Sequence, residues 1–184
     1  MNSQEEIIID SDMTFEEAIK GTNAPDSIIK NLVLLDIKYI SFDKKMHKGQ
    51  LVIHKELAEE VKEIFKIILE ENFPIEKMIP IVKYGWSDDK SMEDNNTSAF
   101  NYRFVAGTTR LSNHSFGRAI DINPFFNPVI YPNGKKVPSK AKYEPDKPGR
   151  LHENHKIVKE FKSRGWRWGG NFSKYADLHH FDKN

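Results

Sequence analysis

The sequence predicts a small, single-domain α+β fold. Segments rich in β-branched and aromatic residues are mixed with two amphipathic helical patterns, without the regular strand–helix–strand alternation of a parallel α/β fold. A length of 184 residues suits one domain. Hydrophobic residues make up 38% of the chain and charged residues 30%, which is typical of a globular protein that buries a core.

The chain begins with an acidic segment that lacks a clear periodic pattern. We expect residues 1–13 to form a flexible lead-in and residues 14–184 to form the functional domain. Thr14 followed by Glu17 fits a capping box, in which each side chain bonds the backbone N–H of the other's position. This pair predicts a short helix over residues 15–20.

A hairpin and a long helix are expected next. Segments 36–42 and 50–54 are rich in β-branched and aromatic residues, and Gly49 between them predicts a turn. The following stretch places apolar residues on one face at a period of 3.6, with Glu and Lys opposite, which predicts a core-facing helix that Pro74 ends. The apolar positions are Leu57, Val61, Ile64, Phe65 and Ile68.

The central segment is predicted from composition. Residues 78–86 and 100–105 carry β-branched and aromatic side chains, so both are expected to be strands. Residues 87–96 are polar and turn-like, so we expect a loop between them.

The C-terminal part combines a long loop, a helix and a final strand. Residues 124–149 contain six prolines and predict a long ordered loop, whose length is itself a hint of function. Residues 152–164 have an apolar helical face and end at Gly165, which suits a helix C-terminus. Residues 166–180 are aromatic and glycine-rich and lead into a short strand.

Composition excludes several classes of function. The net charge of +1 argues against a nucleic-acid partner or an anionic membrane surface. No apolar stretch approaches the roughly 20 residues needed to span a bilayer, and the N-terminus lacks a secretory signal pattern. The absence of cysteine excludes disulfides, thiolate metal sites and a cysteine nucleophile. A bound metal must therefore use His, Asp or Glu.

Two short motifs carry residues with metal-ligand chemistry. Asp121 follows His114 by seven residues, and Gly117 between them permits a tight turn that lets both reach one ion. Near the C-terminus, His179 and His180 are adjacent, so in a strand they face opposite sides and only one can be the third ligand. Three protein ligands with one open position are the pattern of a catalytic zinc.

Together these motifs resemble a known family. The pattern Ser-x-His-x-x-Gly-x-Ala-x-Asp spans residues 112–121, and Asp-x-x-His spans residues 177–180. Both are similar to motifs of the zinc D-Ala-D-Ala carboxypeptidases, which include vancomycin-resistance D,D-carboxypeptidases and phage L-alanyl-D-glutamate endolysins. The resemblance covers roughly residues 95–182, including the Trp-Arg-Trp-Gly-Gly run at 166–170. We expect Trp166 and Trp168 to pack beneath the site.

The resemblance implies one zinc ion per chain and a set of ligands. It implies His114, Asp121 and His180 as the ligands, with His180 preferred to His179 because the family's ligand directly precedes an aromatic residue, here Phe181. It also implies a small α+β fold of the hedgehog/D,D-peptidase kind, with helices packed on an antiparallel sheet and zinc in a cleft. Residues 14–184 would then form the zinc peptidase domain.

Three further residues receive roles from the resemblance. Asp177 matches the general base, Arg103 matches an arginine that binds substrate and stabilises the oxyanion, and Ser112 matches a serine lining the substrate pocket. The chain departs from many relatives in having Asp instead of Glu at 177, and Asp182 after Phe181 where Glu is common.

The expected function is a zinc metallopeptidase acting on peptidoglycan stem peptides, as a D-alanyl-D-alanine carboxypeptidase. The alternatives are an L-alanyl-D-glutamate-type endopeptidase, a non-catalytic relative that binds wall peptides, and a metal-dependent amidase of another fold with convergent ligands. We expect a monomer with a peptidoglycan peptide as its partner. The resemblance implies a periplasmic, cell-wall or secreted location, which the sequence itself does not specify.

Overall fold

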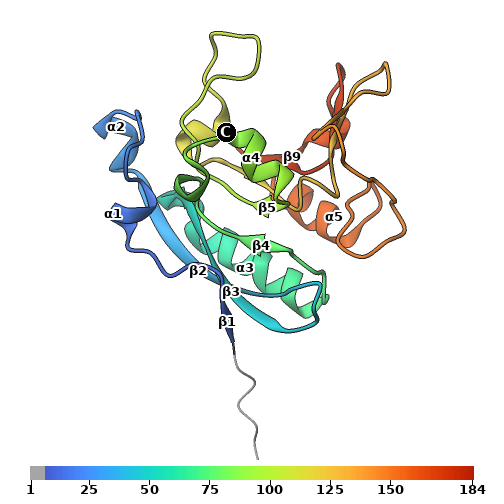
Figure 1. Ribbon diagram of the computed structural model, residues 1–184, viewed down its shortest axis with the longest axis horizontal. Helices are drawn as coiled ribbons and strands as arrows, with labels where there is room; N and C mark the ends of the chain where they lie inside the picture. The colour runs from blue at the N-terminus through green and yellow to red at the C-terminus, as the bar shows by residue number, and fades with distance from the viewer. Residues whose placement is uncertain (1–6) are drawn as a thin grey trace, which may run out of the picture.

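The framework of the molecule is a hairpin of two long strands with a helix packed on one face. The computed structural model describes residues 7–184. Strand β2 (Leu32–Ile40) pairs antiparallel with β3 (Met46–His54) along its full length, and the short β1 (Ile8–Ile9) joins the other edge of β3 in parallel. Helix α3 (Ala58–Glu70) covers the sheet (Figure 1).

The apolar stripe of α3 confirms the predicted long helix. Val61, Ile64 and Ile68 are fully buried, and Leu57 and Phe65 are nearly so. They belong to one core with inward-facing residues of β2 and β3, such as Leu35 and Ile53, so the 3.6-residue period corresponds to the buried face.

The hairpin is confirmed, but the expected turn at Gly49 is wrong. The strands are joined by a turn after Ser41, while Gly49 lies inside β3 opposite Ile37. A Cβ atom at Gly49 would stand 2.3 Å from the carbonyl oxygen of Met78. Glycine is therefore needed there because another segment of backbone passes close to the strand, and glycine inside a strand often marks such a close approach.

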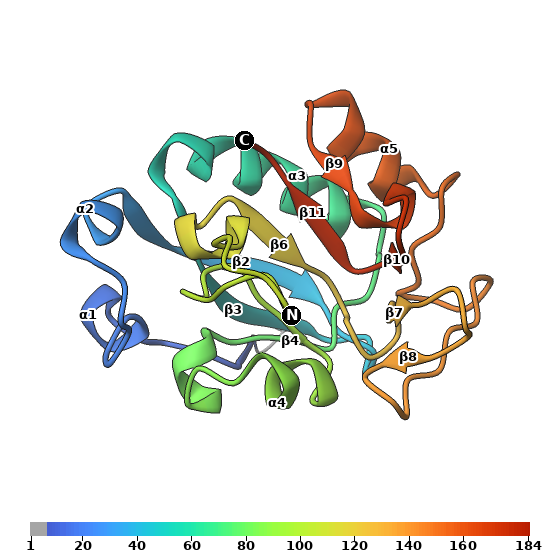
Figure 2. The same cartoon turned by 90° about the horizontal axis from the view of Figure 1, so that it is seen from above.

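A second, three-stranded antiparallel sheet lies beside the first and carries the motifs (Figure 2). Its order is β6 (Ala119–Asp121), β11 (His180–Asp182), β9 (Arg167–Trp168). Helix α5 (Lys156–Ser163) packs against it. The register places His180 directly opposite Asp121. Two residues far apart in the sequence are thus brought side by side.

Aromatic packing anchors this second sheet. The rings of Phe161 in α5 and Phe181 in β11 are stacked with centroids 4.0 Å apart, and both side chains are fully buried. Trp166 meets Phe161 edge to face, and the Nε1–H of Trp168 donates to the carbonyl of Leu178 at 3.0 Å. Both tryptophans are buried. They therefore pack inside the protein, as expected, against α5 and the second sheet.

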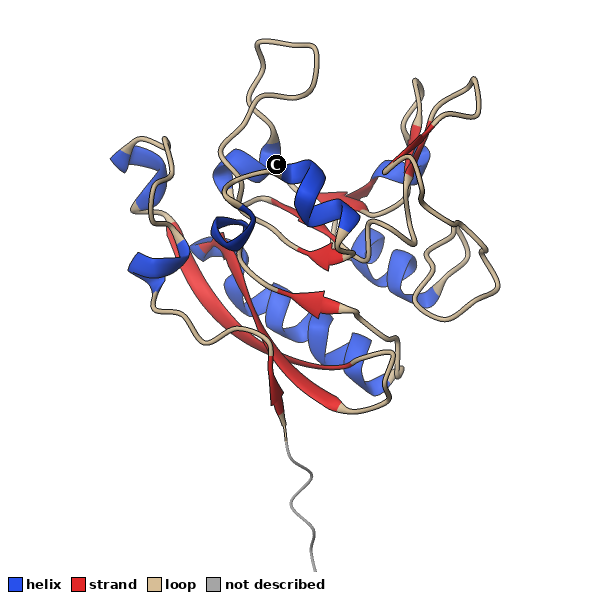
Figure 3. Cartoon of the chain, in the orientation of Figure 1, coloured by secondary structure: helices blue, strands red, loops and turns tan. Residues whose placement is uncertain are grey.

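The remaining elements are short and complete the surface around the two sheets (Figure 3). A third sheet has the order β10-β7-β8 and is antiparallel, whereas β4 and β5 form a parallel pair. In chain order, these elements are α1 (Phe15–Ala18), α2 (Asp26–Ile29), η1 (Lys55–Leu57), β4 (Lys77–Met78), η2 (Ile81–Tyr84), α4 (Asp88–Glu93), β5 (Asn96–Thr97), η3 (Asn113–Phe116), β7 (Val129–Ile130), β8 (Lys136–Val137), η4 (Gly169–Asn171) and β10 (Ala176–Asp177), where η denotes a 3-10 helix.

Three predictions for the central segment are wrong. The strand expected over 78–86 ends at Met78, and η2 follows it. The loop expected over 87–96 is largely helix α4, because the side chain of Ser87 accepts from the N–H of Lys90 and caps it. The strand expected over 100–105 has only an isolated bridge between Phe104 and Leu111.

The N-terminal segment contains the predicted short helix and also contacts the first sheet. The capping box of Thr14 and Glu17 is present and begins α1, which ends at Ala18. Residues 1–6 of the expected lead-in lie outside the described residues. From residue 8 onward the segment is attached to the first sheet, since Ile8 and Ile9 pair with β3 and the Ser11 hydroxyl donates to Gln50 at 2.6 Å.

The long proline-rich segment is confirmed as an ordered loop with two short strands, β7 and β8. Asn127 holds its two ends together: the side chain is fully buried, its amide donates to the carbonyl of Gly149 at 3.0 Å, and its oxygen accepts from the N–H of Leu151 at 2.7 Å. The helix expected over 152–164 begins later, with His155 as its N-cap.

These elements together make a small, single-domain α+β fold, as predicted. Within residues 7–184, none of the helices has the length and apolar character that crossing a bilayer requires.

Candidate metal centre

A single 3-10 turn presents His114. The Ser112 hydroxyl accepts from the N–H of His114 at 3.3 Å and begins η3, and Gly117 ends it with a φ of 65°. A Cβ atom at Gly117 would also lie 2.6 Å from the backbone nitrogen of His54. Only glycine meets both conditions, so the chain turns here into β6 and Asp121. The tight turn predicted at Gly117 is confirmed.

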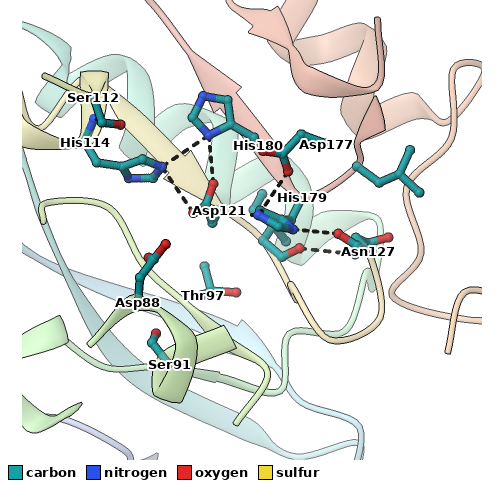
Figure 4. A network of polar contacts seen from close by, with 12 residues as sticks. Asp88, Ser91, Thr97, Ser112, His114, Asp121, Asn127, Asp177, His179 and His180 are labelled. Carbon is teal, nitrogen blue, oxygen red and sulfur yellow. Dashed lines mark hydrogen bonds and ion pairs between the residues drawn. The ribbon is translucent and has the colours of Figure 1, made fainter. Parts of the chain in front are cut away.

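The side chains of His114, Asp121 and His180 converge on one point (Figure 4). His114 Nε2 lies 3.2 Å from His180 Nδ1 and 3.1 Å from Asp121 Oδ2. His180 Nδ1 lies 3.0 Å from Asp121 Oδ1. His114 and Asp121 are almost fully buried. These side chains come from η3, β6 and β11, so the second sheet and the turn before it assemble the group.

The donor geometry fits a tetrahedral cation. Ligand atoms about 2.1 Å from a zinc ion at tetrahedral angles stand roughly 3.4 Å apart, close to the three separations observed here. Two imidazole nitrogens and a carboxylate oxygen are donors that zinc takes in catalytic sites. The group could therefore hold a metal ion, and its His and Asp side chains are of the donor types that remain in a chain without cysteine.

The second nitrogen of each imidazole is also engaged. The Nδ1–H of His114 donates to the backbone carbonyl of Ala99, which leaves Nε2 to face the centre. His180 shows the opposite arrangement, with Nε2 3.3 Å from Asp182 Oδ2 and Nδ1 facing the centre. Outer hydrogen bonds of this kind select the tautomer and fix the ring plane.

The electrostatics of the group favour positive charge. Burial would raise the pKa of Asp121, but the charges of His114 and His179 and the hydrogen bonds from His114 and His180 hold it well below its usual value. Burial would lower the pKa of His180, but its hydrogen bonds to Asp121 and Asp182 outweigh this and raise the pKa to about 10. The buried carboxylate of Asp121 thus stands beside two imidazoles in a setting that suits the binding of a divalent cation.

Asp177 lies beside this group at the end of β10. Its Oδ1 is 3.0 Å from Nε2 of His179, whose Nδ1–H donates to the carbonyl of Asn127 at 2.7 Å. Burial lowers the pKa of His179, but the charges of Asp177 and Asp121 dominate and raise it to about 9. His179 thus contacts the two carboxylates and lies outside the three-residue group.

Arg103 and Ser112 border the same cavity, which has a volume of about 310 Å³. His114, Asp177, His180 and Asp182 form other parts of its wall. The guanidinium of Arg103 is held by Asp88 of α4, with Nη2 2.9 Å from the carboxylate.

The backbone of Arg103 is fixed by Ser115. The Ser115 hydroxyl accepts from the N–H of Arg103 at 2.9 Å and donates to its carbonyl at 2.7 Å. Of the six candidate site residues, five line the cavity, and the sixth, Asp121, contacts His114 and His180.

Comparison with known families bears on the same region. Residues 106–183 match the family model described as D-alanyl-D-alanine carboxypeptidase. This is the family that the motifs resemble. The matched region is less than half of the chain. Searches of curated proteins and of solved structures give no match.

The carboxypeptidase-family match contains one part of the site and leaves another outside. His114, Asp121, Asp177 and His180 all lie within residues 106–183, whereas Arg103 lies just before them. Residues before the matched region support it, because the carbonyl of Ala99 accepts from His114 and the N–H of His54 in β3 donates to the carbonyl of Gly117 at 2.8 Å. Val61 of α3 and Ile53 of β3 also share one core with Phe181 of the matched region, so the first sheet and α3 support the part that resembles the carboxypeptidase family.

Sequence reasoning missed the residues that surround this group. Asp182 was noted only as a departure from relatives, yet it is 3% exposed and joins His180 to Arg167 and Asn113. Burial would raise the pKa of Asp182, but hydrogen bonds from His180 and Arg167 lower it far below its usual value. The period of two along β11, which places residues 180 and 182 on one face, was the available signal.

Proposed function

We propose that this protein is a zinc metallopeptidase that hydrolyses peptidoglycan stem peptides, acting as a D-alanyl-D-alanine carboxypeptidase. The observation that carries the proposal is the convergence of His114 Nε2, Asp121 and His180 Nδ1, which lie 3.0–3.2 Å from one another, as three ligands of a tetrahedral ion would. The carboxylate of Asp177 lines the same cavity. The match of residues 106–183 to the D-alanyl-D-alanine carboxypeptidase family supports the same activity. Residues 14–184 would form the peptidase domain.

His114, Asp121 and His180 are proposed as the ligands of one zinc ion per chain. Zinc bound there would supply a Lewis acid that polarises the scissile carbonyl and lowers the pKa of a bound water to roughly 7. The Ala99 carbonyl and the Asp182 carboxylate leave the two inward nitrogens as acceptors, which supports this ligand set.

Asp177 is proposed as the general base. Its carboxylate lines the cavity next to His180, where it can take a proton from the attacking water and return it to the leaving amine. An Asp is one methylene shorter than the Glu of many relatives. A Cβ atom at Gly169 would lie 2.8 Å from the Cβ of Asp177, so the space beside the base is tightly packed, which fits a short side chain held close to the sheet.

Arg103 and Ser112 are proposed to act on the substrate. The Arg103 guanidinium borders the cavity and can donate to the oxyanion of the tetrahedral intermediate, a contribution of roughly 3–4 kcal/mol for a single donor of this type. Ser112 lines the same cavity and also caps η3, so it shapes the pocket and fixes His114 together.

Metal content tests the ligand set. Elemental analysis of the purified protein should give about one zinc per chain. His114→Ala should lose the metal, whereas His152→Ala, a histidine outside the site, should keep it. A wild-type protein that takes up no zinc would overturn the proposal at its first step.

Product analysis tests the reaction. Chromatography of treated muropeptides should show loss of a single D-Ala from pentapeptide stems, and Asp177→Asn should retain zinc while losing turnover. Stems split between L-Ala and D-Glu would instead identify an endopeptidase. A zinc-loaded protein that binds wall peptides without cleaving any of them would identify a recognition module.

A further inference from the structure

Asp182 is a buried carboxylate that the proposed reaction does not use. It lies in β11 two residues after His180, so the alternation of a strand places both side chains on the same face. We infer that Asp182 is a positioning residue that fixes the tautomer and ring orientation of His180 for metal binding. This inference rests on the proposed role of His180 as a ligand.

The contact between the two side chains determines which nitrogen is free. Asp182 Oδ2 lies 3.3 Å from His180 Nε2, and an ionised carboxylate can only accept. With a cation bound by Nδ1 and by Asp121, Asp182 is the carboxylate that remains to accept the proton of a neutral His180 ring, so that proton sits on Nε2. The lone pair of Nδ1 is left facing His114 and Asp121, at 3.2 Å and 3.0 Å. The other tautomer, with the proton on Nδ1, would instead point an N–H at the centre.

The carboxylate of Asp182 is itself held from two other elements. The guanidinium of Arg167 in β9 donates to both oxygens, at 2.8 Å from Nε and 2.6 Å from Nη2. The amide of Asn113 in η3 donates to Oδ2 at 2.9 Å. Asn113 directly precedes His114, so one carboxylate links the turn that carries one proposed ligand to the strand that carries another.

The ion pair with Arg167 does not by itself account for burying Asp182. The side chain of Arg167 is 56% exposed, whereas that of Asp182 is 5% exposed. A pair with one partner in solvent is screened and stabilises a fold only slightly. Burying the carboxylate costs free energy of desolvation. We attribute this burial to the contact of Asp182 with His180, which orients the imidazole.

The test compares zinc affinity in matched variants. Competition with a chromophoric chelator should give wild-type affinity for Asp182→Glu within a few-fold, and roughly 10–100-fold weaker affinity for Asp182→Asn. Asp94→Asn is the control, because Asp94 holds Lys77 and Tyr84 at 2.8 Å and 2.7 Å outside the site. It should leave zinc affinity unchanged.

A spectroscopic signature separates orientation from general loss of structure. In the zinc-loaded wild type, nitrogen NMR should show His180 protonated on Nε2, and Asp182→Asn should change or broaden this signal while circular dichroism stays the same. If Asp182→Asn fails to fold, Arg167→Ala replaces it, with an expected several-fold loss of zinc affinity.

The outcomes distinguish this inference from the proposed function. A wild type without zinc would overturn both. A wild type that binds zinc, with Asp182→Asn or its substitute Arg167→Ala binding it equally tightly, would overturn only the positioning role of Asp182.

Discussion

Gly169 stands so close to Asp177 that a Cβ atom on it would lie 2.5 Å from the carbonyl oxygen of Asp177 and 2.8 Å from its Cβ. It would also lie 3.1 Å from the Cβ of His180. The glycine after Trp168 is therefore required by space: the backbone of η4 passes directly over the strand that carries the proposed base.

Gly169→Ala should displace Asp177. We expect roughly 100-fold lower kcat, because a shift of about 1 Å in a reacting group has an effect of this size, with zinc content close to that of the wild type. Steady-state kinetics and elemental analysis would check this. Gly49→Ala is the matched control, since its methyl is equally crowded by Met78 but outside the cavity. Equal kcat values in the wild type and Gly169→Ala would contradict the role of this contact.

Asp88→Ala should weaken catalysis through Arg103. Asp88 lies 2.9 Å from the guanidinium, so its loss frees the side chain to leave the cavity. We expect roughly tenfold lower kcat/KM on a pentapeptide stem, because a donor that is no longer held in place stabilises the oxyanion less. Asp89→Ala, at the next position of α4, provides the comparison and should behave as the wild type. A wild-type kcat/KM for Asp88→Ala would show that the ion pair between Asp88 and Arg103 has no role in catalysis.

Glu60 should contribute stability that depends on pH. Burial would raise its pKa, but hydrogen bonds from Lys183 and Trp166 prevail and lower it. Because the folded-state pKa is depressed, the stabilisation is present above the unfolded value of about 4.3 and is lost as pH falls through the folded pKa.

Urea unfolding of Glu60→Gln should show this dependence. The variant should be less stable than the wild type at pH 7, and the difference between the two should shrink toward pH 3. Measuring both proteins at each pH removes the contribution of the metal centre, which titrates in each. A difference that stays constant down to pH 3 would show that the charge of Glu60 is not the source.

Phe161→Ala should destabilise the second sheet. The ring stacks on Phe181 at 4.0 Å and is fully buried, so its removal should cost about 3–5 kcal/mol in the free energy of unfolding. Phe104→Ala, at a side chain that is 56% exposed, should change it by about 0.5 kcal/mol or less. Chemical denaturation of the zinc-loaded proteins measures both. Similar losses for the two variants would mean that the stacked pair does not anchor the sheet.

The sequence predicted well those elements whose pattern is local. The stripe of α3 repeats at a single period and faces a single core, so Val61 and Ile64 identified the helix and its buried face. The capping box at Thr14 likewise needs only four residues. The α+β class followed from the mixture of such signals.

Residues 78–105 were predicted poorly because tertiary contacts decide their structure. Ile81 is buried in a 3-10 turn, where an apolar run has no strand period to maintain. Phe100 packs in a separate small core with Ala18 and Leu32, so its burial does not require a strand. Ser87 is compatible with either a loop or a helix cap, and only the following turn distinguishes them.

The candidate site divides in the same way. His114, Asp121 and His180 were predicted from motifs, and the structure brings them together. The contacts of Asp182 with Arg167 and of Arg103 with Asp88 depend on strand register and on the placement of α4. A single sequence contains no spacing rule for such pairs, which is why these supporting partners were missed.

The three converging side chains also bear on how the chain holds its shape. His114 and His180 are 66 residues apart in a protein that has no cysteine. An ion bound by both would be a reversible cross-link that closes this 66-residue loop. A covalent cross-link between the same two positions would stabilise the fold by about 4 kcal/mol, because it restricts the unfolded chain. The metal concentration would then determine the stability of the folded protein as well as its activity. A chelator would remove the cross-link between η3 and β11 and lower the free energy of unfolding.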